Sequence, residues 1–380
     1  MHEPPPADFD DHARPNRFEI DLGAIAQFTR EIRTLVGDGV TVFAALKCNA
    51  YGFGLVPVAR TILAAGGDAL SLVDRANAIA LRRAGITAPI LVYPGSVATP
   101  EAVSAVETFD LIPTFIDLPS AALYSRLATK ALRVAVKVDI GQERLGFPAE
   151  AAAEAIAAIA RMPNLRVHIV NAHPNVPSSE ALDYLDWQLG RFEAMCRQLE
   201  TRGIAVPIRM IASSKILALT SRLTLNAVDP GQMFFGPFRA AGDVPWDTGR
   251  QAFKMLSSRL IHVRTLERSA FPKEAPFPVR AGMRIGVMPI GAADGMAQLH
   301  CGEVLVRGRR ARVVGNPSLE HTRVDLTDIP QAQLGDEVVI IGAQGGERIA
   351  PDAVVAHQGH ARIADLAMAI RPSIPRRYVE

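Results

Sequence analysis

The sequence predicts an α/β protein made of a (β/α)8 TIM barrel followed by a C-terminal, mostly β domain. Over the first 240 residues or so, short apolar runs alternate with segments of helical periodicity, and there are eight such runs. Strands that are apolar on both faces are typical of a parallel sheet covered by helices. Eight strand–helix units of this size favour a closed barrel over the open doubly wound sheet, which is the structural alternative.

Each expected strand of the barrel is a short run rich in branched apolar residues. The eight runs lie at 40–47, 68–73, 89–93, 110–114, 132–138, 165–172, 208–213 and 226–229. Segments with helix-forming composition separate them, at 22–36, 54–66, 75–84, 99–107, 149–160 and 180–202. This alternation predicts strand–helix units along the whole of the barrel.

The character of the sequence changes after about residue 240, where helical periodicity fades and Gly and Pro become frequent. Further β-rich runs follow at 258–264, 284–290, 302–307, 322–326 and 337–342. A run of strands after alternating elements indicates a separate domain. We therefore expect a flexible N-terminal arm over residues 1–16, a cofactor-binding barrel over 17–240 and a β-rich domain over 241–380.

Composition excludes several classes of function. The chain has 380 residues, of which 49% are apolar and 21% charged, and its formal net charge is +2, so neither nucleic acid nor an anionic membrane is an expected partner. It has no apolar run of about 18 residues, so we expect no membrane span. Its three cysteines have no paired spacing, which argues against a disulfide framework and a zinc site. We expect a cytoplasmic protein without a metal.

The sharpest local feature is Lys47, which ends the run at 40–47 and precedes a turn containing Gly52 and Gly54. Residues at the carboxyl ends of barrel strands face the active site. A partly desolvated lysine amine there is a usable nucleophile toward an aldehyde, although a lysine at a strand end also commonly extends into solvent.

The segment around Lys47 resembles the cofactor-lysine motif of the alanine racemase family. Lys47, Ala50, Tyr51, Gly52 and Gly54 match that motif, and Phe53 replaces its histidine. The resemblance implies that the protein is an enzyme with pyridoxal 5'-phosphate as cofactor. It also implies that Lys47 holds this cofactor as a Schiff base and is the catalytic residue, and that Tyr51 helps to bind the phosphate.

Further motifs extend the resemblance along the barrel. Residues 136–147 resemble a strand motif of the family, which implies that Arg144 supports the cofactor's phenolate oxygen and that Lys137 is a structural lysine that is sometimes carbamylated. Ala172-His173 resembles a threonine–histidine pair, which implies that His173 lies against the pyridine ring. Two later segments imply further cofactor-binding residues, namely Ser213, Ser214, Asp229, Gly231 and Gln232.

In the C-terminal domain, residues 289–295 resemble the loop that carries the family's second acid/base, a tyrosine. That position is Ala292 here, and Leu319 and Glu320 stand where methionine and aspartate are usual in a substrate-facing loop. The resemblance covers residues 17–378. It implies a fold-type III barrel and a homodimer in which each active site is completed by the partner's C-terminal domain.

Two departures leave the reaction open. A methyl group at Ala292 cannot transfer a proton, whereas racemisation by two opposed bases needs a donor on each face. Asp229 replaces an arginine that faces the pyridine nitrogen, and a carboxylate there favours a protonated ring. The resemblance implies an amino-acid racemase. The alternative is chemistry on one face, as in a decarboxylase, aldolase, transaminase or eliminase, and a third hypothesis is cofactor binding without catalysis. The sequence does not identify the amino-acid substrate.

Overall fold

The computed structural model describes residues 14–176, 182–220, 223–237, 246, 249–267, 275–359 and 362–380. The chain divides into two compact units. The barrel unit contains Ala24–Ala50 and Gly54–Arg250. The β unit contains Met1–Gly23, Tyr51–Phe53 and Gln251–Glu380.

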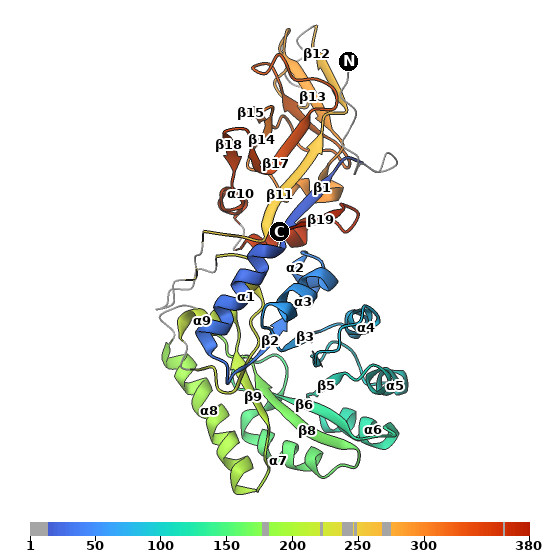
Figure 1. Cartoon of the computed structure of the whole chain (residues 1–380), viewed down its shortest axis with the longest axis vertical. Coiled ribbons are helices and arrows are strands. Elements are labelled where there is room, and N and C mark those ends of the chain that lie inside the picture. Colours follow the sequence, from blue (N-terminus) through green and yellow to red (C-terminus); the bar gives the residue numbers. More distant parts are fainter. Residues whose placement is uncertain are drawn as a thin grey trace. The chain divides into compact units, whose positions relative to one another are not determined.

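A closed barrel of eight parallel strands forms the centre of the barrel unit in the described part of the chain, which confirms the predicted fold (Figure 1). Strand β10 pairs with β2, and this pairing closes the barrel. Around the barrel, the strands are β2 (Thr41–Ala45), β3 (Ala69–Leu72), β4 (Ile90–Val92), β5 (Ile112–Phe115), β6 (Leu132–Asp139), β8 (Leu165–Ala172), β9 (Ile208–Ala212) and β10 (Ala227–Val228). The two-residue strand β7 (Phe147–Pro148) pairs with the end of β6.

Helices surround the strands of the barrel unit (Figure 1). They are α1 (Leu22–Val36), α3 (Leu55–Ala64), α4 (Arg75–Arg83), α5 (Pro100–Thr108), α6 (Leu118–Leu127), α7 (Ala149–Ala160), α8 (Leu182–Thr201) and α9 (Ser214–Leu219). Local sequence defines several starts, since the side chains of Asp74, Thr99 and Asp117 accept backbone hydrogen bonds at the N-caps of α4, α5 and α6. None of the described helices could span a lipid bilayer.

The interior of the barrel is filled by one apolar side chain from each strand. These residues pack together in one buried cluster, which consists of Phe43, Ala69, Leu91, Ile112, Ala135, Ile169, Met210 and Ala227. Because side chains alternate between the two faces of a strand, the residues two positions further along point into the barrel as well. This apolar cluster, called the apolar floor below, lies directly beneath the side chains at the carboxyl ends of the strands.

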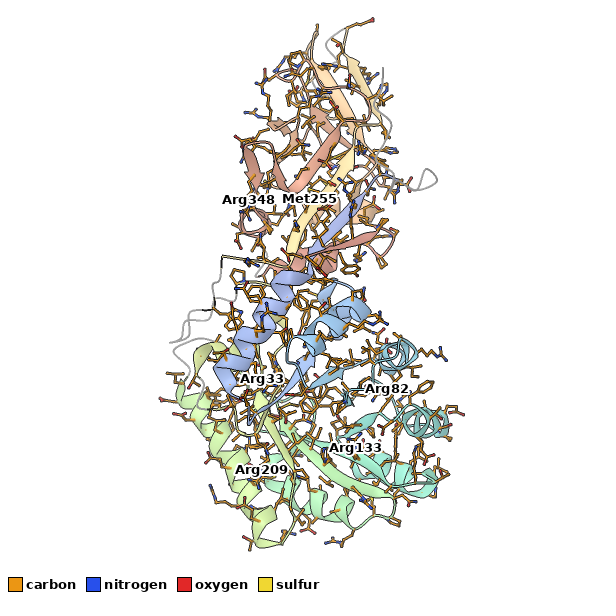
Figure 2. The ribbon with its side chains drawn as sticks, in the orientation of Figure 1. Arg33, Arg82, Arg133, Arg209, Met255 and Arg348 are labelled. Atoms are coloured by element: carbon orange, nitrogen blue, oxygen red, sulfur yellow. The ribbon has the colours of Figure 1, made fainter. Side chains whose placement is uncertain are left out.

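Two arginines hold the opposite, amino-terminal ends of the strands (Figure 2). The guanidinium of Arg82 donates four hydrogen bonds of 2.7–3.0 Å to the carbonyls of Ile86, Ala88, Phe109 and Asp110. Arg33 likewise donates to the carbonyls of Gly37, Val40 and Gly66. These loops lead into β2, β3, β4 and β5, so this end of the barrel has a structural role.

The β unit is built on a seven-stranded sheet and a three-stranded sheet. The larger sheet contains β1 (Arg17–Asp21), β11 (Phe253–Arg259), β14 (Glu303–Val306), β15 (Arg309–Arg312), β17 (Glu337–Gln344), β18 (Glu347–Ile349) and β19 (Arg376–Val379). The smaller sheet contains β12 (His262–Thr265), β13 (Arg284–Met288) and β16 (Thr322–Asp325), and the unit also has helices α10 (Pro351–Gln358) and α11 (Ile363–Ala369). The mostly β character predicted for this domain is confirmed.

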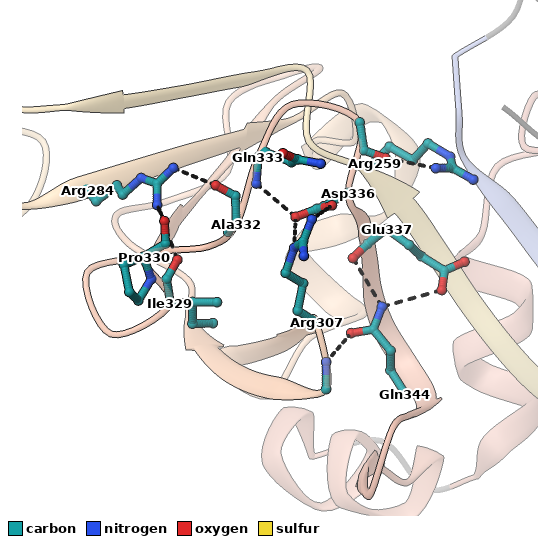
Figure 3. Close-up of polar contacts among 12 residues, drawn as sticks. Arg259, Arg284, Arg307, Ile329, Pro330, Ala332, Gln333, Asp336, Glu337 and Gln344 are labelled. Atoms are coloured by element: carbon teal, nitrogen blue, oxygen red, sulfur yellow. Dashed lines mark hydrogen bonds and ion pairs between the residues drawn. The ribbon is translucent and has the colours of Figure 1, made fainter. Parts of the chain in front are cut away.

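Polar contacts fix the loop between β16 and β17 (Figure 3). Arg307 forms an ion pair with Asp336, with nitrogen–oxygen distances of 2.5 and 2.8 Å. Asp336 also accepts the backbone N–H of Gln333 at 2.8 Å. The guanidinium of Arg284 donates to the carbonyls of Pro330 and Ala332, so the loop is held by side chains from two other segments.

The N-terminal strand departs from the expected domain boundaries. The sequence analysis assigns residues 17–240 to the barrel, but β1 pairs with β11 and β19 in the β unit. The reason is the alternating pattern of this segment, because Phe18 and Ile20 are fully buried and the ring of Phe18 lies 4.6 Å from that of Phe253. Most of the expected arm over 1–16, and the expected boundary at 240, lie outside the described residues.

Candidate active site

A polar layer lies next above the apolar floor of the barrel, at the carboxyl ends of the strands. Two residues beyond the floor on six strands stand Ser71, Tyr93, Thr114, Lys137, Asn171 and Asp229. Within the described chain, Ser71 Oγ, Thr114 Oγ1 and Asn171 Nδ2 are buried atoms without a hydrogen-bond partner. Since buried polar groups are normally satisfied, this layer is suited to receive a ligand or water.

Lys47 follows β2, two residues beyond Ala45 in the same inward series. The next four residues, Cys48 to Tyr51, all have φ between 53° and 55°, so the chain turns in a left-handed sense directly after the lysine. The side chain of Asn49 supports this turn by accepting the backbone N–H of Leu55 at 2.9 Å. Lys47 is an exposed residue in this single chain.

Lys137 is buried near the centre of the polar layer. Its Nζ donates a hydrogen bond of 3.3 Å to Asn171 Oδ1 and lies 5.2 Å from the centre of the Tyr93 ring. Burial lowers the pKa of Lys137 to about 8, against the favourable charge of Asp229. The pKa of this amine is therefore well below that of an ordinary lysine.

Asp229 lies at the end of β10 and is 9% exposed. Burial raises the pKa of its carboxyl to about 6, although the Tyr93 hydroxyl and the charges of Lys137 and Lys47 favour the ionised form. The hydroxyl of Tyr93 donates to Asp229 Oδ2 at 2.6 Å. The fold thus brings Asp229, which was predicted from the sequence, close to Lys137 and Lys47.

His173 and Arg144 follow β8 and β6. Burial lowers the pKa of His173 to about 4, and nearby cationic side chains add to the shift, namely Lys137, Lys47 and Arg144. Arg144 is itself exposed. Its loop is held by Asp139, whose carboxylate accepts four backbone N–H groups, from Gly141 to Arg144, at 2.8–3.1 Å. These bonds keep the pKa of Asp139 below its usual value in spite of partial burial.

Ser214 connects the ends of β9 and β10. Its Oγ accepts the backbone N–H of Gly231 at 2.8 Å and that of Met233 at 3.4 Å. The hydroxyl hydrogen of Ser214 remains as a donor. Ser213 and Gln232 lie beside this contact in sequence and are half-buried. The structure thus brings Ser214 and Gly231 together.

The other predicted residues lie in the β unit. Tyr51 is buried and groups with this unit. Ala292, which is exposed, begins the 3-10 turn Ala292–Asp294, and its N–H donates to Ser318 at 2.8 Å. Leu319 is 74% exposed, and its carbonyl accepts the N–H of Ala293 at 2.9 Å. Glu320 is exposed in the same loop. The two predicted substrate-facing loops therefore form one hydrogen-bonded surface.

Four members of the polar layer were not predicted from the sequence, namely Ser71, Tyr93, Thr114 and Asn171. Each is a polar or aromatic residue at or near the end of an apolar run, two positions beyond an inward-facing apolar residue. Counting inward positions in steps of two along every strand would have found them.

Comparisons with known proteins cover both units. Residues 20–238 match the family model of the alanine racemase N-terminal domain, and residues 255–378 match that of the alanine racemase C-terminal domain. Alanine racemase 2 of Caldanaerobacter subterraneus subsp. tengcongensis is 31% identical over 349 residues, which are 90% of this chain and 89% of that protein. Alanine racemase of Methanococcus maripaludis is 32% identical over 87% of this chain and 90% of its own length.

The solved structures give the same result. The crystal structure of alanine racemase from Bacillus anthracis with bound L-Ala-P has a TM-score of 0.85 and 26% sequence identity, and covers 97% of this chain and 95% of that chain. The structure from E. faecalis has the same TM-score and identity over 97% of this chain and 99% of its own. With family models that together span nearly all of the described residues, this chain belongs to the alanine racemase family.

Proposed function

We propose that this protein is an amino-acid racemase-like isomerase that uses pyridoxal 5'-phosphate attached to Lys47. The observation that carries the proposal is the position of Lys47 at the carboxyl end of β2, where its charge acts on Lys137, His173 and Asp229. The family to which the chain belongs depends on this cofactor. The relatives named above are all alanine racemases, so the comparisons give no support to one-face chemistry.

The residues at the barrel mouth fit the cofactor chemically. A primary amine at Lys47 suits its aldehyde, and the buried carboxyl of Asp229 suits its pyridine nitrogen. Ser214 offers a hydroxyl donor for the phosphate beside the Gly231–Gln232 backbone, in the usual position after the last two barrel strands. The unpartnered polar atoms of the same layer agree with a site that a ligand completes.

The bound cofactor would supply an electron-withdrawing ring that weakens the bonds at the Cα of an attached amino acid. With the substrate amine in its place on the cofactor, Lys47 would be a free amine, able to take the Cα proton and return it on one face. His173, with a pKa of about 4, stays neutral at pH 7 and presents an uncharged ring. Arg144 would supply a fixed positive charge on a loop that Asp139 holds in place.

Return of the proton on the second face requires a donor that Ala292 does not provide. We propose a homodimer in which the loops of Ala292 and Leu319 complete the partner's site, with water or another side chain as the second donor. A small residue at position 292 would also leave space for a substrate larger than alanine. Light scattering at several protein concentrations tests the dimer, and a concentration-independent monomer would contradict it.

The central experiment combines labelling with stereochemistry. The protein is supplied with pyridoxal phosphate, reduced with borohydride and mapped by mass spectrometry, and we expect the adduct on Lys47. Incubation of L- and D-amino acids in deuterated water, followed by chiral analysis, should give Cα exchange with formation of the other enantiomer. The Lys47→Ala variant should lose both signals, whereas Lys130→Ala, which removes an exposed lysine of the same unit, should keep them.

Each outcome is decisive. A colourless protein without an adduct at Lys47 rejects the cofactor assignment. An adduct accompanied by Cα exchange with full retention of configuration rejects racemisation and leaves chemistry on one face. An adduct without turnover of any amino acid in the panel leaves cofactor binding alone.

A further inference from the structure

Tyr93 donates its hydroxyl hydrogen to Asp229, a buried carboxyl at the barrel mouth. It directly follows β4, and its hydroxyl donates to Asp229 Oδ2 at 2.6 Å across 136 residues of sequence. Its ring packs against the apolar floor of the barrel. The phenol is therefore fixed from below by packing and at its tip by the carboxyl.

Among the described residues, three groups that can carry charge or a proton act on Asp229, each from a different strand. Tyr93 comes from the end of β4, Lys137 from β6, and Lys47 from the end of β2. The backbone N–H of Asp229 donates to the carbonyl of Ala212 at 2.9 Å, so β9 fixes the main chain. The phenol of Tyr93 donates a hydrogen bond directly to the carboxyl of Asp229.

This contact has a consequence for protonation. A hydrogen bond donated to a carboxylate stabilises the ionised form, whereas burial in an apolar barrel favours the neutral acid. Lys137 adds to the first effect, since its ammonium interacts with both the Tyr93 ring and the charge of Asp229. The charge state of Asp229 is thus a balance in which Tyr93 has a direct part.

We propose that Tyr93 is a positioning residue that holds the Asp229 carboxylate in one orientation and in its ionised form, and thereby keeps a proton on the pyridine nitrogen of the bound cofactor. The proposal rests on the proposed function, because it needs the ring nitrogen of pyridoxal phosphate at Asp229. It adds a residue that the sequence analysis did not single out.

The test is a pH titration of the absorption spectrum of the cofactor-loaded protein. A neutral Asp229 no longer supplies the negative charge that stabilises a protonated ring nitrogen, so its protonation should change the spectrum. The Tyr93→Phe variant loses one hydrogen bond of ordinary strength to Asp229. The midpoint of the spectral titration should therefore rise by about one pH unit, which is a tenfold change in the proton affinity of Asp229. The Asp229→Asn variant should lose this transition altogether.

A substitution that should move the midpoint in the opposite direction distinguishes a specific effect of the hydroxyl from a general disturbance of the fold. Fluorotyrosine placed at position 93 has nearly the size of tyrosine and is a stronger donor, so it should move the midpoint down. The matched control is Tyr124→Phe, since Tyr124 is a buried tyrosine of the same unit that packs against Phe115. This control should leave the midpoint where it is in the unsubstituted protein.

Equal midpoints for tyrosine, phenylalanine and fluorotyrosine at position 93 would overturn the proposal, and so would an unchanged titration in Asp229→Asn. Failure of the proposed function gives a different result, namely no adduct at Lys47 and no spectrum to titrate. In that case denaturant unfolding of the cofactor-free protein across pH decides whether Tyr93 controls Asp229. If Tyr93→Phe leaves that pH dependence unchanged, the coupling is absent.

Discussion

Arg14 and Asp294, which are 280 residues apart in the chain, form a two-pronged ion pair in the β unit with nitrogen–oxygen distances of 2.8 and 2.9 Å. Asp294 is 1% exposed and also accepts the backbone N–H of Gly291 at 3.0 Å. The pair therefore fixes both ends of the short turn that carries Ala292. A side chain near the N-terminus thus shapes a loop of the candidate substrate-facing surface.

Removal of one partner of this pair should be costly. The Asp294→Ala variant removes the carboxylate that accepts from Arg14 and from the Gly291 N–H. Because Arg14 is partly exposed, we expect a loss of about 1–3 kcal/mol in unfolding free energy. Denaturant unfolding measures the loss, and hydrogen exchange over residues 289–296 shows whether it begins in this loop. Asp328→Ala, which removes an exposed acid of the same unit, should have little effect; equal stability of the two variants would contradict the role of the ion pair.

Ala292 offers a gain-of-function test. If the homodimer is as proposed, the Ala292→Tyr variant supplies a phenol as the second proton donor, and the rate of racemisation should rise by roughly 10²-fold. Chiral chromatography of L- and D-alanine incubations measures the rate. The neighbouring substitution Ala293→Tyr is the control for added bulk. If Ala293→Tyr also raises the rate of racemisation, or if Ala292→Tyr does not raise it, position 292 has no role in proton transfer.

Asp229 should make stability depend on pH in an unusual direction. Its pKa is raised from 3.8 to about 6, so the folded state binds the proton more tightly than the unfolded state. The contribution of this group to stability is therefore complete below pH 3.8 and is lost as the pH rises through 6. We expect the cofactor-free protein to lose about 1–3 kcal/mol from this source between pH 4 and 7.5.

The measurement for Asp229 is denaturant unfolding at both pH values in the unsubstituted protein and in Asp229→Asn. The difference in unfolding free energy between the two proteins should change by about 1–3 kcal/mol between pH 4 and 7.5, because the asparagine does not titrate. Asp38→Asn, at an exposed aspartate of the same unit, should show no such shift. A pH dependence shared by all three proteins would mean that Asp229 titrates normally.

Arg82 should matter for stability and not for the candidate site. The Arg82→Met variant keeps the aliphatic stem but leaves four loop carbonyls without a charged donor, and we expect a loss of about 2–4 kcal/mol. Cofactor binding per folded molecule should not change, since these contacts lie at the amino-terminal ends of the strands. Arg161→Met, at an exposed helix end, is the control. Weakened cofactor binding in a stable Arg82→Met protein would contradict this division of roles.

Much of the barrel could be predicted because its signals are local. The predicted run at 165–172 matches β8 (Leu165–Ala172), and the predicted helix at 149–160 matches α7 (Ala149–Ala160). The strands β15, β18 and β19 of the β unit were missed because they are short and rich in charged residues. β15 and β18 form hairpins with the strands that precede them, whereas β19 pairs with β1 near the other end of the chain. The same holds for β1, whose partners β11 and β19 lie more than 200 residues away.

For the site, the sequence by itself determined which residues could do chemistry: an amine at Lys47, a carboxyl at Asp229, and a methyl group at Ala292 where a proton donor is expected. The tertiary structure alone decided which of them meet. Tyr93 contacts Asp229 and Lys137 because closure of the barrel turns alternate residues of separate strands toward one interior. Such contacts depend on strand register and on burial, which no single segment of the sequence contains.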